Sequence, residues 1–411
     1  MHYSNKKDTL VNFSKYIFYP MKPFILIILC FAVCTIYARE NKIRSGYWET
    51  SLHLDPTHDL KVRTFFNDNQ LIIKNGEESI ILKDFKNEEN QIRIPFKLYE
   101  SEIIIKFVSK KIISGYWKNM SKGPDYMIQF TSKFKKFKHK QNDHLQSFAG
   151  RWDITMGQDE KIIGEFSVKK NCLLGTFLTE TGDYRYLEGS AIGDSMFLSC
   201  FDGSHAFLFD AILTNDTLRG EFLSGTHYKE AWFGVKNDSA QLRNPESITY
   251  IINNNPVKLS LIDSDNQPFV YPSSPNQKIT ILQIFGTWCP NCIDETMFLN
   301  DIYNQYQTDI DIVAIGFERG KTEDDRIKQL KRFKNNLDIK YKVVLGGIAD
   351  KQIASALFPM LSDIIAFPTI IILNNKNQIL KVHTGFSGPA TGPHYIDFKT
   401  HLEAYLNRLI K

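Results

Sequence analysis

The sequence is short of cysteine, of net charge and of long hydrophobic runs. Six cysteines occur among 411 residues, and the formal net charge is only +4. Residues 1–38 hold four lysines and one aspartate, so most of this excess lies at the N-terminus. The remainder is close to neutral and provides no strong field to attract a charged partner. The composition therefore gives no reason to expect a nucleic-acid partner.

The one long apolar run covers residues 24–38 and ends in Ala38. Its length of 15 residues is short of the roughly 20 that a membrane helix needs. A basic start, an apolar stretch and a terminal alanine are typical of a secretory signal, in which Met21 is a candidate start. We expect an exported protein of the bacterial periplasm or cell envelope, with residues 1–38 as signal peptide. A retained membrane anchor, or a lipid anchor at Cys34, is the alternative.

Too few cysteines remain for a zinc site. Removal of the signal leaves four: Cys172, Cys200, Cys289 and Cys292. A structural zinc ion would need two further ligands beside a Cys-x-x-Cys pair, so we expect no metal and no cofactor. An even number in an exported protein permits disulfides. Cys172 and Cys200 are either such a pair or simply buried small side chains.

Helical periodicity is scarce between residues 40 and 245, where short alternating runs are separated by turn residues. We divide this part into a β-rich module at 39–143 and an antiparallel meander at 144–245. Asp202-Gly203 and Asn215-Asp216 are typical of tight hairpins, because such pairs tolerate φ > 0. Eight evenly spaced runs predict a barrel or sandwich. The expected strands are 149–156, 160–169, 172–179, 184–190, 195–201, 204–213, 217–223 and 228–236.

The pattern changes in residues 246–411 to alternating strands and helices, which predicts an α/β domain with a mixed sheet. The expected strands are 278–286, 311–317, 341–345, 369–374 and 378–384. The expected helices are 290–306, 323–337, 350–360 and 395–410.

Cys289 and Cys292 are spaced for redox chemistry. Cys289 comes at the N-terminus of a predicted helix, where unpaired N–H groups and the helix dipole stabilise a thiolate. Pro290 fits the first helical turn. Cys292 lies one turn further on and can close a disulfide with Cys289. We therefore expect Cys289 to be the exposed nucleophile and Cys292 the buried resolving thiol.

These residues stand within motifs of a known family. Phe285-Gly286-Thr287 leads into Trp288-Cys289-Pro290-Asn291-Cys292, and Phe367-Pro368-Thr369 follows later. The segment 257–411 resembles the TlpA/ResA-like extracytoplasmic thioredoxins. This resemblance implies a multidomain chain, with an all-β N-terminal region followed by a thioredoxin-like fold. It also implies a cis Pro368 beside the dithiol, with neighbouring backbone that pairs with the substrate chain.

The resemblance assigns roles to three further residues. Glu295 matches a glutamate that tunes the thiols or carries a proton, although an exposed first-turn residue is the alternative. Gly385 matches a glycine that lets substrate backbone approach. Gln283 stands where cytoplasmic thioredoxins keep a buried acid, and glutamine cannot accept a proton. Glu318-Arg319 ends a strand and is a candidate lining of the active face, but we favour a surface turn. We assign no catalytic role to His383 or His394.

We therefore expect a thiol–disulfide oxidoreductase that reduces protein disulfides and is recharged by a membrane electron donor. An antioxidant peroxiredoxin is an alternative, but Gly286 and Leu282 stand where that chemistry needs a hydroxyl residue and a proline. A β-domain binding protein with an accessory thioredoxin domain is the third hypothesis.

Overall fold

The computed structural model describes residues 43–67, 69–135, 144–158, 160–272, 278–306 and 308–411. Residues 43–411 form one compact unit. The predicted signal at 1–38 lies outside the described residues. Among the described helices, none combines the length and the apolar character needed to cross a bilayer.

The first sheet is antiparallel and open at both edges, with strand order β4-β3-β2-β1-β9-β8-β7-β6-β5. Alternating burial along β1 and β2 sends Trp48, Leu52 and Leu60 into one core, as a sheet with a single covered face requires. A 3-10 turn, η1 (Met120–Lys122), precedes the last strand. The strands are β1 (Gly46–His53), β2 (Asp59–Asn67), β3 (Gln70–Asn75), β4 (Glu78–Leu82), β5 (Lys86–Glu88), β6 (Gln91–Pro95), β7 (Ser101–Val108), β8 (Ile112–Asn119) and β9 (Met127–Phe134).

The second sheet closes into a barrel, because β11 pairs with β10 on one side and with β12 on the other. Asn215 and Asp216 adopt positive φ in the β16–β17 hairpin, as their turn sequence predicts. The short helix α2 (Leu145–Phe148) leads into this sheet. Its strands are β10 (Gly150–Met156), β11 (Glu160–Lys169), β12 (Cys172–Thr179), β13 (Gly182–Asp183), β14 (Leu187–Ile192), β15 (Ser195–Phe201), β16 (Ala206–Thr214), β17 (Thr217–Ser224) and β18 (Tyr228–Lys236).

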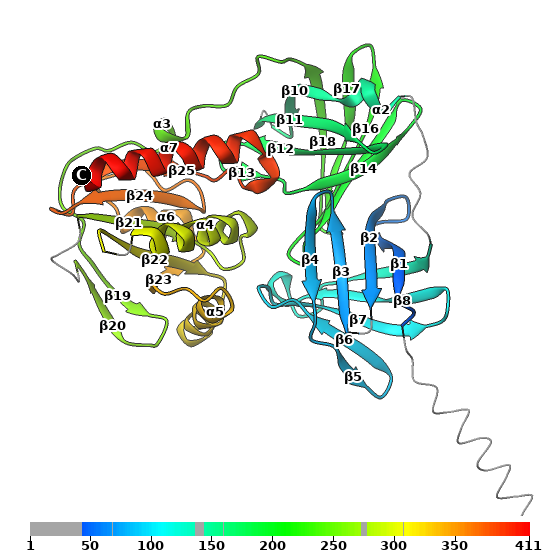
Figure 1. Cartoon of the computed structure of the whole chain (residues 1–411), viewed down its shortest axis with the longest axis horizontal. Coiled ribbons are helices and arrows are strands. Elements are labelled where there is room, and N and C mark those ends of the chain that lie inside the picture. Colours follow the sequence, from blue (N-terminus) through cyan, green and yellow to red (C-terminus); the bar gives the residue numbers. More distant parts are fainter. Residues whose placement is uncertain (1–42, 68, 136–143, 159, 273–277, 307) are drawn as a thin grey trace, which may run out of the picture. The chain divides into compact units, whose positions relative to one another are not determined.

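The third sheet is mixed, in the order β20-β19-β23-β22-β21-β24-β25 (Figure 1). Its central strands are buried and apolar on both faces. Helices α4, α5 and α7 cover one face, and α6 covers the other. The strands are β19 (Leu259–Asp263), β20 (Pro268–Tyr271), β21 (Ile279–Phe285), β22 (Ile310–Glu318), β23 (Lys342–Ile348), β24 (Thr369–Asn374) and β25 (Ile379–Thr384). The helices are α3 (Pro245–Ile248), α4 (Pro290–Tyr306), α5 (Glu323–Asn336), α6 (Lys351–Ala356), η2 (Pro389–Thr391) and α7 (Pro393–Ile410).

The expected fold class is confirmed: β-rich sheets precede a C-terminal thioredoxin-like domain. Two details differ from expectation. The helix predicted at 350–360 ends at Ala356, because Pro359 lacks an N–H and disfavours helical backbone just before it. The β19–β20 hairpin was not predicted, since Asp263 and Asn266 form its turn within a run with little alternation.

One buried arginine connects all three sheets. Arg185 follows β13, and its guanidinium pairs with Glu78 of β4 (Nη2–Oε1, 2.9 Å) and with Asp294 of α4. Its Nε lies 3.8 Å from Asp202, beyond the end of β15. Only 8% of the Arg185 side chain is exposed, so this ion-pair cluster is shielded from water.

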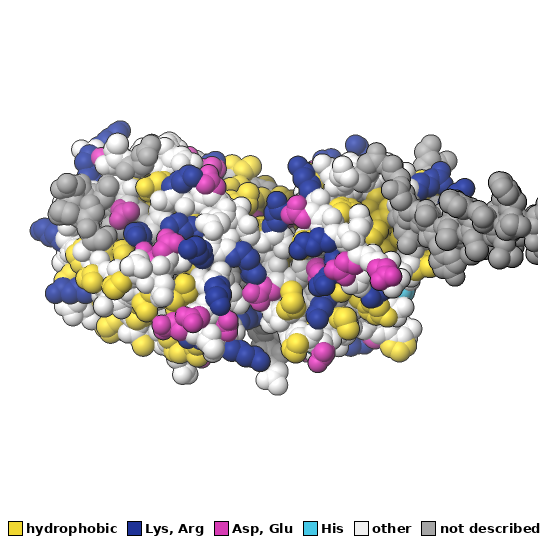
Figure 2. Space-filling model, turned by 90° about the horizontal axis from the view of Figure 1, so that it is seen from below, with side chains coloured by type: hydrophobic (Ala, Val, Ile, Leu, Met, Phe, Trp, Pro, Cys, Tyr) yellow, Lys and Arg dark blue, Asp and Glu magenta, His cyan; other side chains and the backbone are white. Residues whose placement is uncertain are grey.

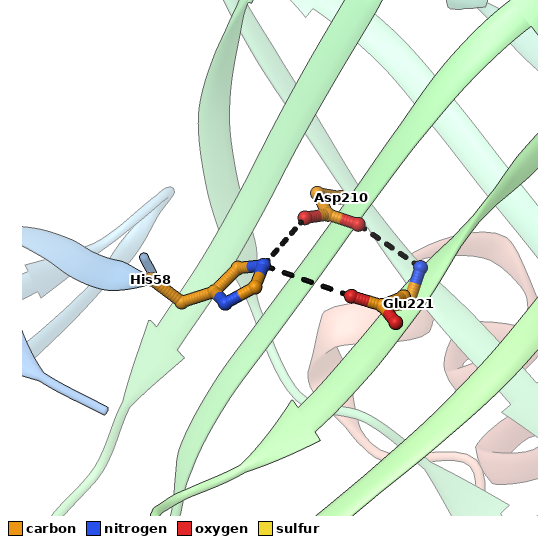
Figure 3. A group of neighbouring side chains, drawn as sticks. All are labelled: His58, Asp210 and Glu221. Carbon is orange, nitrogen blue, oxygen red and sulfur yellow. Dashed lines mark hydrogen bonds and ion pairs between the residues drawn. The ribbon is translucent and has the colours of Figure 1, made fainter. Parts of the chain in front are cut away.

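A second junction joins the first and second sheets. Nε2 of His58 lies 3.3 Å from Oδ2 of Asp210 and 3.7 Å from Oε2 of Glu221, two neighbouring carboxylates on β16 and β17 (Figure 3). Asp55 contacts the other ring nitrogen at 2.8 Å. Although the three side chains are spaced for a cation, Lys229 Nζ already lies 2.6 Å from Oε2 of Glu221. We interpret the group as an ion-pair junction.

Charged side chains of both signs are intermixed over the face seen in Figure 2. This agrees with the small net charge of the sequence. Electrostatic recognition by this protein therefore depends on local groups of charges.

Candidate active site

Cys289 occupies the N-cap position of α4, directly after the β21–α4 loop. Its carbonyl accepts from the N–H of Ile293 at 3.2 Å, and its Sγ accepts from the N–H of Cys292 at 3.2 Å. The sulfur thus takes the place of the oxygen that usually caps a helix. Pro290 begins the helix as expected. Both thiols are free in this structure, and burial raises the pKa of Cys292 well above its ordinary value.

The Phe367–Pro368 loop lies against the nucleophile. Its peptide bond is cis, as the resemblance implies. The thiol of Cys289 donates to the carbonyl of Phe367 across 3.5 Å. Thr369 begins β24 directly afterwards, and its Oγ1 donates to Ala366 at 2.9 Å. The dithiol and this loop, predicted from separate motifs, therefore meet at one place.

Glu295 is fully buried, which contradicts the exposed alternative. Its Oε2 accepts from Nε2 of Gln283 at 2.9 Å, while Oε1 has no hydrogen-bond partner. Burial raises the pKa of Glu295 well above its ordinary value. Gln283, which stands on β21 where related proteins keep an acid, therefore uses its amide to orient the carboxyl of Glu295 on α4. Glu295 is placed to exchange a proton near the two cysteines.

Glu318 lies much deeper in the structure than its sequence context indicates. It was expected in a surface turn, yet only 1% of it is exposed at the end of β22. Its carboxyl accepts from the N–H (2.9 Å) and the hydroxyl (2.6 Å) of Thr287. Burial raises the pKa of Glu318 to about 8. Glu318, buried at the end of β22, thus holds Thr287 in place two residues before Cys289.

Trp288 is held from two sides. Its indole N–H donates to the carbonyl of Phe317 at 2.9 Å. The guanidinium carbon of Arg319 lies 3.8 Å from the centre of the ring, a cation–π arrangement. The ring of Phe367 makes an edge-to-face contact with the Trp288 ring. Trp288 is therefore held in one orientation, and the guanidinium of Arg319 lies on its ring.

The second sheet covers the helix end that carries the dithiol. Asn291 Nδ2 donates to the carbonyl of Asp183 at 3.2 Å. A Cβ at Gly385 would lie 2.8 Å from the carbonyl oxygen of Glu180. The chain's own backbone thus occupies the place where the resemblance puts substrate backbone. For the same reason Cys289 is only 8% exposed, which corrects the expectation of an exposed nucleophile.

Other residues singled out from the sequence lie away from the dithiol. His383 packs on Phe398, and its burial lowers its pKa to about 4. His394 contacts Glu165 of β11 at 3.0 Å. Cys172 and Cys200 are free and buried, on strands that β14 separates, so the alternative of buried small side chains is confirmed and the disulfide alternative is wrong.

Comparison with known proteins places the C-terminal part in a family. Residues 245–394 match the family model described as Redoxin. The thioredoxin-like protein YneN of Bacillus subtilis is 25% identical over 108 residues, covering 26% of this chain and 57% of the relative. The thiol-disulfide oxidoreductase ResA of Halalkalibacterium halodurans is 25% identical over 109 residues, covering 26% and 54%. The match thus spans little more than half of these curated relatives.

Solved structures give a weaker likeness. A putative protein disulfide isomerase from Bacteroides thetaiotaomicron is 17% identical with a TM-score of 0.30, covering 41% of this chain and 94% of that one. The Redoxin match includes the Cys289–Cys292 helix start and the cis Pro368 loop. The C-terminal domain of this chain matches the Redoxin family model and is similar to ResA-like members of the thioredoxin superfamily.

Proposed function

We propose that this protein is a thiol–disulfide oxidoreductase whose Cys289–Cys292 dithiol reduces disulfides in the bacterial cell envelope. The observation that carries the proposal is the N-cap geometry. Cys289 Sγ receives the N–H of Cys292 at 3.2 Å and faces the carbonyl of Phe367 at 3.5 Å. A sulfur held by helix N–H groups is suited to react as a thiolate. The names of the two relatives support the same chemistry.

The reaction balances through a mixed disulfide. The Cys289 thiolate attacks one sulfur of the substrate disulfide, and the other sulfur leaves and takes up a proton. Cys292 loses its proton and attacks the Cys289 sulfur, which releases the second thiol. The protein becomes the Cys289–Cys292 disulfide after giving two electrons. Glu295 is the proposed proton acceptor for Cys292, because it is buried nearby and its Oε1 has no partner.

Envelope location and a membrane electron donor remain parts of this proposal. The apolar run at 24–38 supports export. A reductase outside the cytoplasm must regain two electrons after each turnover, and a membrane dithiol carrier is the donor class that we propose. A redox titration of the full chain tests the direction. A potential near the roughly −120 mV of strongly oxidising periplasmic catalysts would contradict the reductase assignment.

A trapping experiment tests the nucleophile. In Cys292→Ala the resolving step is lost, so substrates should accumulate as mixed disulfides on Cys289, detectable by mass spectrometry after digestion. Cys172→Ala is the matched control, because it removes a buried thiol remote from α4. It should show no accumulation. If Cys292→Ala forms no adduct on Cys289, the assigned nucleophile is wrong.

A further inference from the structure

A cleft of about 410 Å³ lies in front of the nucleophile. Its volume falls within the usual range for small-molecule sites, roughly 300–1,000 Å³. The β-rich region and the thioredoxin-like domain both contribute side chains, many of them aromatic. The lining includes Lys122, Asp183, Arg185, Trp288, Cys289 and Arg319.

Two cations in this lining have no carboxylate partner. Lys122 donates to Nε2 of His227 at 3.2 Å, and exposed Arg319 stacks on Trp288. Neither forms an ion pair with an acid among the residues that the structure describes. Partial burial, and then the like charge of Arg319, lower the pKa of Lys122 to about 8. Two mutually repelling cations beside a reactive sulfur are suited to receive an anion.

The other charged side chains of the lining already have partners. Arg185 pairs with Glu78 and Asp294, so it is not available to an anion. Oδ2 of Asp183 accepts from the N–H of Gly388 at 2.7 Å, and its Oδ1 accepts from the N–H of Arg185. The lining cations that can still form an ion pair with an anion are therefore Lys122 and Arg319.

The size of the occupant is limited by the second sheet. The carbonyl oxygen of Glu180 would lie 2.8 Å from a Cβ at Gly385, so backbone from this chain fills that side of the site. Asn291 of α4 donates to the carbonyl of Asp183 at 3.2 Å. In the other direction, the hydroxyl of Ser204 donates to the carbonyl of Trp288 at 3.4 Å. The approach of an extended protein segment along Gly385 is therefore obstructed by backbone of Glu180 and Thr181. A small molecule can still reach Cys289 through the cleft.

We propose that this cleft binds a low-molecular-weight disulfide bearing carboxylates, which pair with Lys122 and Arg319 while Cys289 attacks the disulfide. This inference rests on the proposed function. The S–S bond of the small molecule breaks as one of its sulfurs bonds to Cys289. The other sulfur leaves as a thiolate and takes up a proton. Cys292 then releases the second half, so two thiols leave with two electrons from the protein dithiol. An external dithiol restores the protein, and dithiothreitol serves in the assay.

The test compares three small disulfides with the reduced full chain. 3,3′-Dithiodipropionate is dianionic, 2-hydroxyethyl disulfide is neutral and cystamine is dicationic. Each kcat/KM is divided by the rate of the same disulfide with dithiothreitol alone, to remove intrinsic reactivity. We expect about a tenfold preference for the dianion over the neutral probe at low salt, falling toward one near 0.5 M salt because rim charges are screened.

The variants assign this preference to residues. Arg319→Gln, at an exposed position, and Lys122→Gln should each lower the dianion-to-neutral ratio by about threefold or more. Lys328→Gln removes an exposed charge from α5 outside the cleft and should leave the ratio unchanged. Equal ratios in wild type and both cleft variants would overturn the inference.

Two further outcomes are distinct. If the neutral probe is reduced but wild type shows no preference for the dianion, the anion site is wrong and the oxidoreductase function stands. If a protein disulfide such as insulin is reduced faster per disulfide than dithiodipropionate, the small-molecule assignment is wrong. Failure to reduce any disulfide would overturn the proposed function itself.

Discussion

Two regions of this molecule bury two cysteines each, and only one region equips them to react. Cys172 and Cys200 lie on strands of the second sheet, with exposed fractions of 5% and 0%. Cys289 and Cys292 lie at the start of α4, with 8% and 0%. Burial therefore does not separate the pairs. The difference is the surroundings of the sulfur: a helix N–H points at Cys289, whereas the Cys172 thiol donates to a strand carbonyl, Gly189 O, at 3.2 Å.

Both thiols of the second sheet are held in the protonated form. Burial, and then nearby Glu188, raise the pKa of Cys172 to about 12, and burial raises that of Cys200 well above its ordinary value. Such thiols stay protonated and are poor nucleophiles. The comparison teaches that a helix N-terminus and an adjoining cleft, rather than solvent exposure, mark the reactive sulfur here.

Removing the nucleophile should give the largest effect. Cys289→Ser should lower the disulfide-reduction rate by at least about a thousandfold, because a hydroxyl is not ionised at neutral pH. Cys200→Ser and Cys172→Ser should retain the rate per folded molecule, measured with 2-hydroxyethyl disulfide. A comparable loss in either strand variant, with folding intact by circular dichroism, would break the comparison.

Arg185 joins the two regions, so its removal tests their dependence on each other. Arg185→Met should lower the free energy of unfolding by about 3–5 kcal/mol, because Glu78 and Asp294 lose their buried partner. The control is Arg243→Met, whose solvent-exposed pair with Glu180 should change the free energy of unfolding far less. Denaturant titration measures both. Equal losses would show that the buried cluster does not hold the modules together.

Alkylation sharpens the contrast between the pairs. In the native reduced protein, iodoacetamide should modify Cys289 at least about a hundredfold faster than Cys172 or Cys200, because only thiolates react. Peptide mass spectrometry gives each rate separately, and labelling in denaturant provides the reference. Similar native rates at all sites would contradict the assignment of a single reactive sulfur.

The smallest effect concerns Glu318 beneath the reactive pair. Its folded pKa of about 8 lies above the ordinary 4.5. Between these values the unfolded chain releases the proton and the folded protein keeps it, so stability falls as pH rises. Glu318→Gln should remove about 1–3 kcal/mol of this decline between pH 5 and 8. Denaturation at several pH values measures it, with Glu89→Gln on an exposed turn as control. Parallel profiles for wild type and Glu318→Gln would refute the assigned protonation.

The sequence predicted most of what depends on local pattern. Alternation and turn pairs located the strands of the barrel, and α4 begins at Pro290 as expected. The depth of Glu318 was not predictable, since a Glu-Arg pair after a strand usually ends at the surface. It is buried where its carboxyl accepts two hydrogen bonds from Thr287 of the β21–α4 loop, a contact that exists only in the folded chain. Likewise, the cover over Gly385 comes from residues about 200 positions earlier, a tertiary effect without a local signal.

The position of Arg185 has a consequence for how this protein should be studied in pieces. Its guanidinium pairs with Glu78 of the first sheet and with Asp294 of α4, and it lies near Asp202 beyond β15. A fragment that holds only the thioredoxin-like domain would leave Asp294 without its partner and Gly385 open to water. If the proposed function holds, we expect such a fragment to accept extended protein substrates that the whole chain excludes, so activity should be measured on the whole chain.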